Sequence, residues 1–140
     1  MDEPAFSGLR VVDFSQGIAG PHCGMLLAQH GAEVIKIEPM EGDWCREIGK
    51  QYGDQSSNSI VYNRGKKSIA LNLKNTDGLA IAKSLCKSAD VIIENYRPGV
   101  LARLGLGYAD MKKINPKLIY CSISGYGQTG PYAHRAGYDY

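Results

Sequence analysis

The chain has 140 residues, of which 44% are hydrophobic and 21% are charged, and these values are typical of one globular domain with a substantial core. Its formal net charge is only +2 and its basic residues are scattered, which argues against nucleic-acid binding, and its apolar runs are too short to cross a membrane. The four cysteines stand singly without a Cys-x-x-Cys motif, so their spacing supports neither a metal site nor a disulfide framework.

The beginning of the chain predicts a strand, a glycine turn, a helix and a second strand. The apolar run at residues 9–14 indicates a short buried strand, which breaks at the glycine-rich residues 17–20. Pro21 suits the first turn of the following helix, because the N–H that proline lacks would have no partner there, and Gly31 is placed to cap its end. Residues 33–38 alternate as the second strand, which completes a βαβ unit.

The middle of the chain predicts a long loop followed by further strands and helices. Residues 39–63 are polar and rich in glycine, serine and asparagine, with one short helix expected at residues 59–62. Residues 68–73 alternate as a third strand, and Thr76 is a suitable N-cap for the next helix. The remaining predicted elements are a strand at residues 90–93, two short helices at 100–104 and 108–114, and a strand at 118–123.

Five strands interleaved with helices indicate an α/β fold of the Rossmann-like type, an open and mainly parallel sheet with helices on both faces. Ligands of such folds bind at the carboxyl ends of the strands. The helix after the first strand could offer N–H groups to a phosphate, although turn geometry is the favoured explanation of Gly17 and Gly20. Cys23 lies near the start of that helix, where a thiol pKa can be lowered, but packing is its favoured role.

Cations and an aromatic residue follow the predicted strands. Tyr96 could stack on a flat base, and four basic residues could surround an anionic nucleotide: Lys74, Arg97, Arg103 and Arg135. Coenzyme A (CoA) fits this set, because its 3′-phospho-ADP group is strongly negative and carries an adenine. Each signal is weak alone, since a single arginine is usually solvated and Tyr96 could be a packing residue. Asp13, inside a predicted strand, is expected to be a core acid with a partner of its own.

The order of the motifs adds a family resemblance. Six segments resemble the class III CoA-transferases in order and spacing: residues 8–14, 19–21, 31–38, 63–69, 90–99 and 124–131. That family includes formyl-CoA transferase, carnitine CoA-transferase and succinyl-CoA-dependent dicarboxylate CoA-transferases, with α-methylacyl-CoA racemase as a relative. The resemblance covers nearly the whole chain, and it implies that residues 1–140 are the N-terminal, CoA-binding portion of a larger enzyme whose smaller domain lies downstream.

The resemblance also implies site residues. The positions that match the family's CoA site are Gly17, Ile18, Leu71, Lys74, Asn95, Tyr96, Arg103 and Leu104, and the charge argument adds Arg97 and Arg135. Tyr138 matches a residue close to the thioester, in a supporting catalytic role. Where some relatives carry a cation after the position of Glu38, this chain has Pro39. The substrates implied are an acyl-CoA and a carboxylic acid acceptor, without a metal, in an interlocked homodimer.

Family transferases use a carboxylate nucleophile that attacks the thioester. The matching aspartate is expected downstream, because Asp139 stands in a different motif, so catalysis by these residues alone is not expected. The racemase relatives carry a histidine where this chain has Tyr138, which favours a transferase. Two alternatives stay open: a non-catalytic module, and an NAD-binding domain with Glu38 on the ribose, although the glycines do not form Gly-x-Gly-x-x-Gly.

The amino terminus suggests a location. Residues 1–4 include two acids, where a secretory or mitochondrial leader would carry basic residues. We therefore expect a cytoplasmic protein, or one in the mitochondrial matrix if a leader has been removed.

Overall fold

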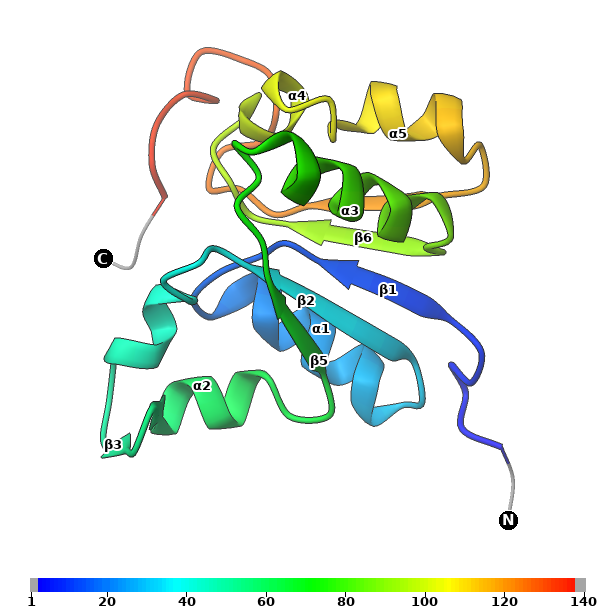
Figure 1. Ribbon diagram of the computed structural model, residues 1–140. Helices are drawn as coiled ribbons and strands as arrows, with labels where there is room; N and C mark the ends of the chain where they lie inside the picture. Colours follow the sequence, from blue (N-terminus) through cyan, green and yellow to red (C-terminus); the bar gives the residue numbers. More distant parts are fainter. Residues whose placement is uncertain (1–2, 138–140) are drawn as a thin grey trace.

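A computed structural model describes residues 3–137, and its centre is a parallel sheet (Figure 1). The sheet contains β1 (Arg10–Asp13), β2 (Glu33–Glu38), β5 (Lys67–Ala70), β6 (Val91–Glu94) and β7 (Ile119–Ser122). Their order across the sheet is β5-β2-β1-β6-β7, and every neighbouring pair is parallel. This is the strand order of a Rossmann-type half: strands are added in one direction from β1 to β5 and in the other from β6 to β7, so that the order switches between β1 and β6. The predicted fold class is confirmed.

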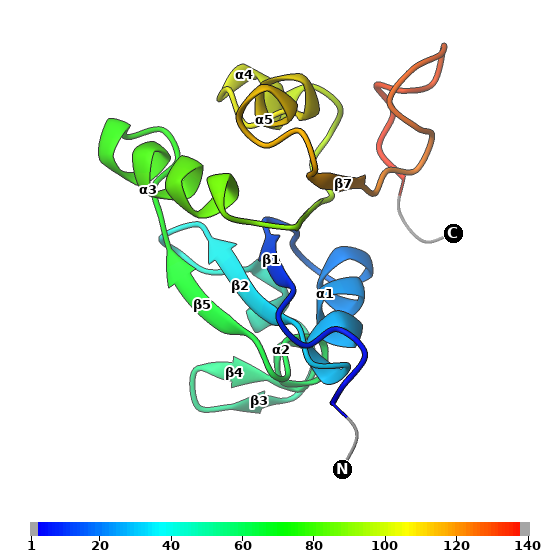
Figure 2. The ribbon, with the colours of Figure 1, turned by 90° about the vertical axis from the view of Figure 1, so that its right-hand side faces the viewer.

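Helices cover both faces of the sheet (Figure 2). The helices are α1 (Ala19–Gln29), α2 (Ser57–Tyr62), α3 (Thr76–Lys87), α4 (Val100–Arg103) and α5 (Tyr108–Ile114). Alternate residues of β1 point to opposite faces, so Val11 packs in one buried cluster with α1 residues such as Leu27. Val12 packs in the other cluster with α3 and α5, where Ala82 and Met111 are buried. None of the helices in residues 3–137 is both long enough and apolar enough to span a membrane.

The ends of the helices follow local chemistry. At the end of α1, the N–H of Gly31 donates to the Ala28 carbonyl and the N–H of Ala32 donates to the Leu27 carbonyl, which is a Schellman motif. Gly31 has φ 103°, so the predicted cap is confirmed. The N-cap of α3 is Asn75 rather than the predicted Thr76, because the Asn75 side chain accepts the N–H of Asp77.

The loop between β2 and β5 contains more structure than its composition predicts. A 3₁₀ turn, η1 (Trp44–Glu47), is followed by a short hairpin of β3 (Gln51–Tyr52) and β4 (Gln55–Ser56). The predicted short helix is present as α2 and begins earlier, at Ser57, because Ser56 and Ser59 form a reciprocal capping box. This loop leaves the carboxyl end of β2 and therefore borders the ligand-binding edge of the sheet.

Candidate functional site

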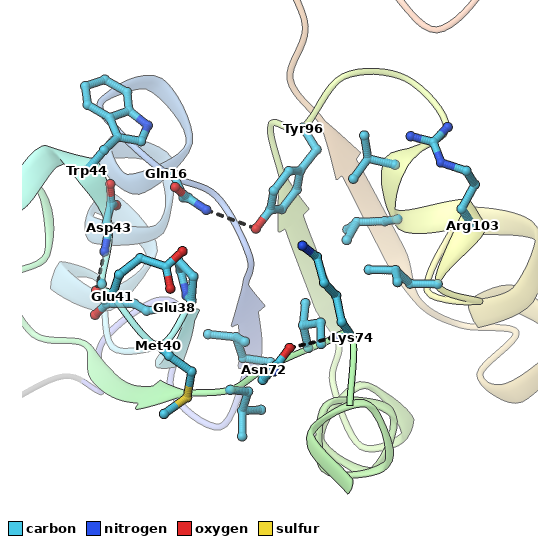
Figure 3. Close-up of a pocket in the computed structure, with 18 of the residues that line it drawn as sticks. Gln16, Glu38, Met40, Glu41, Asp43, Trp44, Asn72, Lys74, Tyr96 and Arg103 are labelled. Carbon is cyan, nitrogen blue, oxygen red and sulfur yellow. Dashed lines mark hydrogen bonds between the residues drawn. The ribbon is translucent and has the colours of Figure 1, made fainter. Parts of the chain in front are cut away.

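A cavity of about 730 Å³ lies at the carboxyl ends of β2, β5 and β6 (Figure 3). It is bordered by the segments that follow these strands and by α4. Five of the residues predicted to bind a coenzyme line it together: Leu71, Lys74, Tyr96, Arg103 and Leu104. The volume is within the usual range for a small-molecule or cofactor site.

A second cavity, of about 460 Å³, lies beside the first. The predicted residues that line it are Ile18, Asn95, Tyr96, Arg97 and Arg135. Gln16, Trp44 and Tyr96 line both cavities, so the two are neighbours along one groove. Among the predicted residues that the structure describes, only Gly17 lines neither cavity, and Tyr138 lies outside the described residues.

Charges in the first cavity are separated between its walls. Lys74 and Arg103 lie on the side of β5 and α4, whereas Glu41 lies on the opposite side, after β2 (Figure 3). Glu38 and Asp43 also border the cavity, but both are buried and paired with cations. An anionic ligand would therefore place its phosphates along the wall that carries Lys74 and Arg103.

A buried ion pair anchors the turn between β1 and α1. Lys36 Nζ lies 2.9 Å from Asp43 Oδ2, and both side chains are 1% exposed. Lys36 also donates to the Ser15 carbonyl at 2.6 Å, while Asp43 Oδ1 accepts the N–H of Gly17 at 2.9 Å and that of Cys45 at 2.9 Å. The N–H of Gly17 is thus occupied within the protein, which supports a structural role for this glycine.

The ends of β1 and β6 are clamped together by amide groups. Asn95 Oδ1 accepts the backbone N–H of Gln16 at 2.9 Å, and Asn95 Nδ2 donates to the Gln16 carbonyl at 2.7 Å. The Gln16 side chain donates to the Tyr96 phenol oxygen at 3.1 Å (Figure 3). Burial raises the pKa of Tyr96 above its ordinary value, so the phenol is neutral near pH 7. Asn95 and Gln16 therefore fix the aromatic wall shared by the two cavities.

A second buried ion pair lies beneath α1. Asp13 is completely buried, and its Oδ2 lies 2.7 Å from Lys66 Nζ, which also donates to the Pro21 carbonyl and to Asn63 Oδ1. The prediction that Asp13 is a core acid with its own partner is confirmed. Burial lowers the pKa of Lys66, although the charge of Asp13 opposes this effect.

Glu38, which would bind the ribose in the NAD alternative, is instead paired with residues of the protein. The Glu38 carboxylate accepts hydrogen bonds from Arg46 at 2.6 and 2.8 Å, from Ser68 at 2.6 Å and from the N–H of Asp43 at 2.9 Å. Its side chain is 3% exposed. A dinucleotide-binding acid must be available to the ligand, so this arrangement argues against the NAD alternative.

The cysteines contribute packing. Cys45 and Cys86 are buried, Cys23 and Cys121 are half-buried, and all four are free thiols. Burial raises the pKa of Cys23, which argues against an activated thiol at the start of α1 and favours packing. No cluster of three or more potential metal-ligating side chains occurs within residues 3–137.

Gly17 supports the ring of Trp44, the only tryptophan in the chain. Gly17 has φ 79° and Gly53 has φ 65°, so alanine at either position costs about 1 kcal/mol of backbone strain. Only at Gly17 would the added methyl group collide with Trp44. We expect Gly17→Ala to cost about 1 kcal/mol more than Gly53→Ala and to shift the emission of Trp44, measured by urea unfolding and fluorescence. Equal stability and equal emission of the two variants would contradict this contact.

Sequence reasoning missed Gln16, Met40, Trp44 and Asn72, which also line the first cavity. One signal was available for Trp44, because a tryptophan in a polar loop that follows a strand is unusual. The structure leaves its side chain 47% exposed. Gln16 carried no such signal. Its position depends on the amide pairing with Asn95, 79 residues away in the chain.

The geometry defines a doubly wound α/β domain with a nucleotide-sized groove at the carboxyl edge of its sheet. The sequence matches the family model described as CoA-transferase family III over residues 6–140. The chain therefore belongs to this family, as its motifs predict.

Relatives and solved structures agree with this assignment. The chain is 47% identical to the succinate–glutarate CoA-transferase of Agrobacterium fabrum, over 99% of this chain and 36% of that protein. It is 51% identical to the succinyl-CoA:glutarate CoA-transferase of Mus musculus, over 94% of this chain and 31% of that protein. A crystal structure of a CAIB/BAIF family protein from Brucella suis superposes with a TM-score of 0.93 at 43% identity, over 99% of this chain and 38% of that one. The chain thus spans about a third of the length of these relatives.

Proposed function

We propose that this chain binds CoA or an acyl-CoA as the N-terminal part of an acyl-CoA:carboxylate CoA-transferase. In that reaction the thioester bond of the donor breaks, the donor leaves as a carboxylate, and the acceptor carboxylate becomes the new thioester. The observation that carries the proposal is the first cavity, where Lys74 and Arg103 lie on one wall and Tyr96 borders the groove. Cations suit the 3′-phospho-ADP group, and an aromatic face suits its base.

The names of the relatives support the same reaction class. The two glutarate transferases act on dicarboxylic acids by name, and an acetyl-CoA:oxalate CoA-transferase of Acetobacter aceti is 50% identical over 96% of this chain and 35% of that protein. In this proposal the chain supplies binding, and the carboxylate nucleophile comes from the part of the enzyme that corresponds to the remaining two thirds of the relatives. The full enzyme would be a homodimer.

Calorimetric titration of the chain with CoA, and in parallel with NAD, tests the proposal. We expect saturable CoA binding that weakens about tenfold in Arg103→Ala, because a charge-assisted hydrogen bond to phosphate is lost. The matched control is Lys117→Ala, which also removes one exposed cation. Lys117 lies just before the amino end of β7, whereas the cavity lies at the carboxyl ends of the strands. Binding of NAD without CoA, or equal losses in the two variants, would contradict the proposal.

A further inference from the structure

The segment after β7 leaves the sheet and returns to the point where it left. A methyl group added to Gly125 would stand 2.7 Å from the Cα of Gly137, and one added to Gly137 would stand 2.6 Å from the Cα of Gly125, so the two backbones are in direct contact. Figure 2 shows the chain between them extending from the end of β7 away from the sheet. A compact surface segment whose ends meet is an Ω-loop, and such loops are often functional. We call residues 125–137 the Ω-loop, and the contact of its two end glycines the neck.

Side chains of the Ω-loop pack on one another. The centres of the Tyr126 and Tyr132 rings lie 6.0 Å apart, and the guanidinium carbon of Arg135 lies 4.4 Å from the centre of the Tyr132 ring. The backbone N–H of Arg135 donates to the Tyr132 carbonyl at 2.9 Å, and that of Ala133 donates to the Gly130 carbonyl at 3.3 Å. The Ω-loop is therefore a preformed unit, and a change at its neck would move it as one body.

The neck forms one wall of the second cavity. Gly125 and Gly137 both line this cavity, and its other walls include the start of α1 and residues 95–98 after β6. The side of the neck that follows β7 is held to the sheet, because the N–H of Ile123 donates to the Glu94 carbonyl at 2.9 Å. The separation of the two ends of the Ω-loop therefore determines how wide the cavity is at this wall.

The contact at the neck requires glycine on both sides. Neither Gly125 nor Gly137 has a positive φ, so backbone conformation does not demand glycine at either position. The close approach does, since ordinary contacts between carbon atoms are about 3.5–4.0 Å long and a methyl group here would open the neck by roughly 1 Å. Both glycines thus serve the approach of the two backbones and not the shape of a turn.

Building on the proposed function, we propose that Gly125 and Gly137 are positioning residues for CoA, because their contact holds the second cavity at the width that fits the pantetheine arm. The nucleotide of CoA lies against the cations of the first cavity, and the arm passes from there into the second cavity along Trp44 and Tyr96, which line both. The arm is uncharged and flexible, so its affinity depends on close contact with the walls on both sides. A wider neck would weaken the hold on the arm and leave the binding of the nucleotide unchanged.

The test compares CoA with adenosine 3′,5′-bisphosphate, which carries the nucleotide of CoA without the pantetheine arm. Calorimetry measures the affinity of the purified chain for each ligand, and urea unfolding followed by circular dichroism checks that each variant is folded. Gly125→Ala, and separately Gly137→Ala, opens the neck. We expect each variant to bind CoA about tenfold more weakly than the wild type and to bind the bisphosphate equally well.

Gly127→Ala is the matched control within the Ω-loop. Gly127 has φ 83°, but a methyl group added there meets nothing within 4 Å. The substitution strains the backbone of the Ω-loop without opening the neck, so its affinity for CoA should equal that of the wild type.

Proteolysis follows the Ω-loop directly. Trypsin cleaves the bond between Arg135 and Ala136, both of which line the second cavity. We expect CoA to slow this cleavage in the wild type, because its arm occupies the cavity, whereas the bisphosphate should leave the rate unchanged. Mass spectrometry of the products identifies the bond that is cut, and equal protection by the two ligands would contradict a role of the arm.

The outcomes separate this inference from the proposed function. Unchanged CoA affinity in both neck variants, or equal losses for CoA and the bisphosphate, overturns the role of the neck and leaves CoA binding in place. Binding of CoA no more tightly than the bisphosphate by the wild type shows that the arm gains nothing from the second cavity, which also overturns the inference. Absence of binding by both ligands contradicts the proposed function, and the role of the neck with it.

Discussion

Lys36→Met is expected to lower the free energy of unfolding by about 3–5 kcal/mol, because it leaves Asp43 buried without its cation. Both side chains of this pair are 1% exposed, so water cannot replace the missing charge. Lys36 also holds the Ser15 carbonyl, and the same change frees the turn between β1 and α1. Urea unfolding followed by circular dichroism measures the loss, which is a large part of the usual stability of a domain.

Lys67→Met is the matched control for this prediction. Lys67 also pairs with an acid, Glu33 Oε1 at 2.6 Å, but its own side chain is 73% exposed. Exposed pairs contribute little, since water and salt screen the charges, so this variant should unfold close to the wild-type midpoint. Similar midpoints for Lys36→Met and Lys67→Met would show that burial does not strengthen the inner pair.

Glu38→Gln is the second change with a large expected effect, about 3 kcal/mol at pH 7. Burial alone would raise the pKa of Glu38, but hydrogen bonds from Arg46, Ser68 and the Asp43 N–H outweigh it and lower that pKa from 4.5 to about 2. The ionised carboxylate thus stabilises the fold. Glutamine keeps the size of the side chain and removes its charge. The loss in unfolding free energy therefore measures how much the ionised carboxylate contributes to stability.

The pH dependence follows from the lowered pKa. Stability from Glu38 is complete above pH 4.5, the ordinary pKa of the group, and is lost as the pH falls through about 2. The difference in unfolding free energy between wild type and Glu38→Gln should therefore be constant from pH 7 to 5 and shrink between pH 4.5 and 2. Urea unfolding at intervals across this range measures it. A difference that stays constant down to pH 2 would contradict the assigned pKa.

Local patterns predicted the elements that depend on local chemistry. The strand at residues 33–38 and the helix at residues 108–114 have the predicted bounds, because apolar periodicity determines both. The turn η1 and the hairpin of β3 and β4 were missed. Ser56 on β4 donates to the Cys45 carbonyl at 2.6 Å, so this structure depends on contacts between parts of the loop, which composition does not encode.

Sequence reasoning could predict the part of the candidate site that lies at the carboxyl ends of the parallel strands, because ligands of such folds bind there. Lys74, Tyr96 and Arg103 follow strands or lie in the next helix, and the structure brings them to one cavity. The supporting ion pairs were not predictable. Lys36 alternates with apolar residues along β2, a pattern that is typical of a strand with one face in water. Both faces of this sheet are covered, however, so the Lys36 side chain is buried and needs a partner. That partner is Asp43, from the loop after β2.

The strand order has a consequence for folding during synthesis. The first half of the sheet, β5-β2-β1, is built from residues 10–70, whereas β6 begins only at Val91 and adds to the other edge of β1. At the usual speed of translation, the residues from the end of β5 to the end of β6 take roughly one to five seconds to synthesise, and β1 lacks that partner throughout this interval. Its free backbone groups, next to the apolar Val11 and Val12, form a temporary open edge on which another chain could pair. The nascent chain is therefore most open to aggregation, and most in need of a chaperone, between the completion of β5 and the arrival of β6.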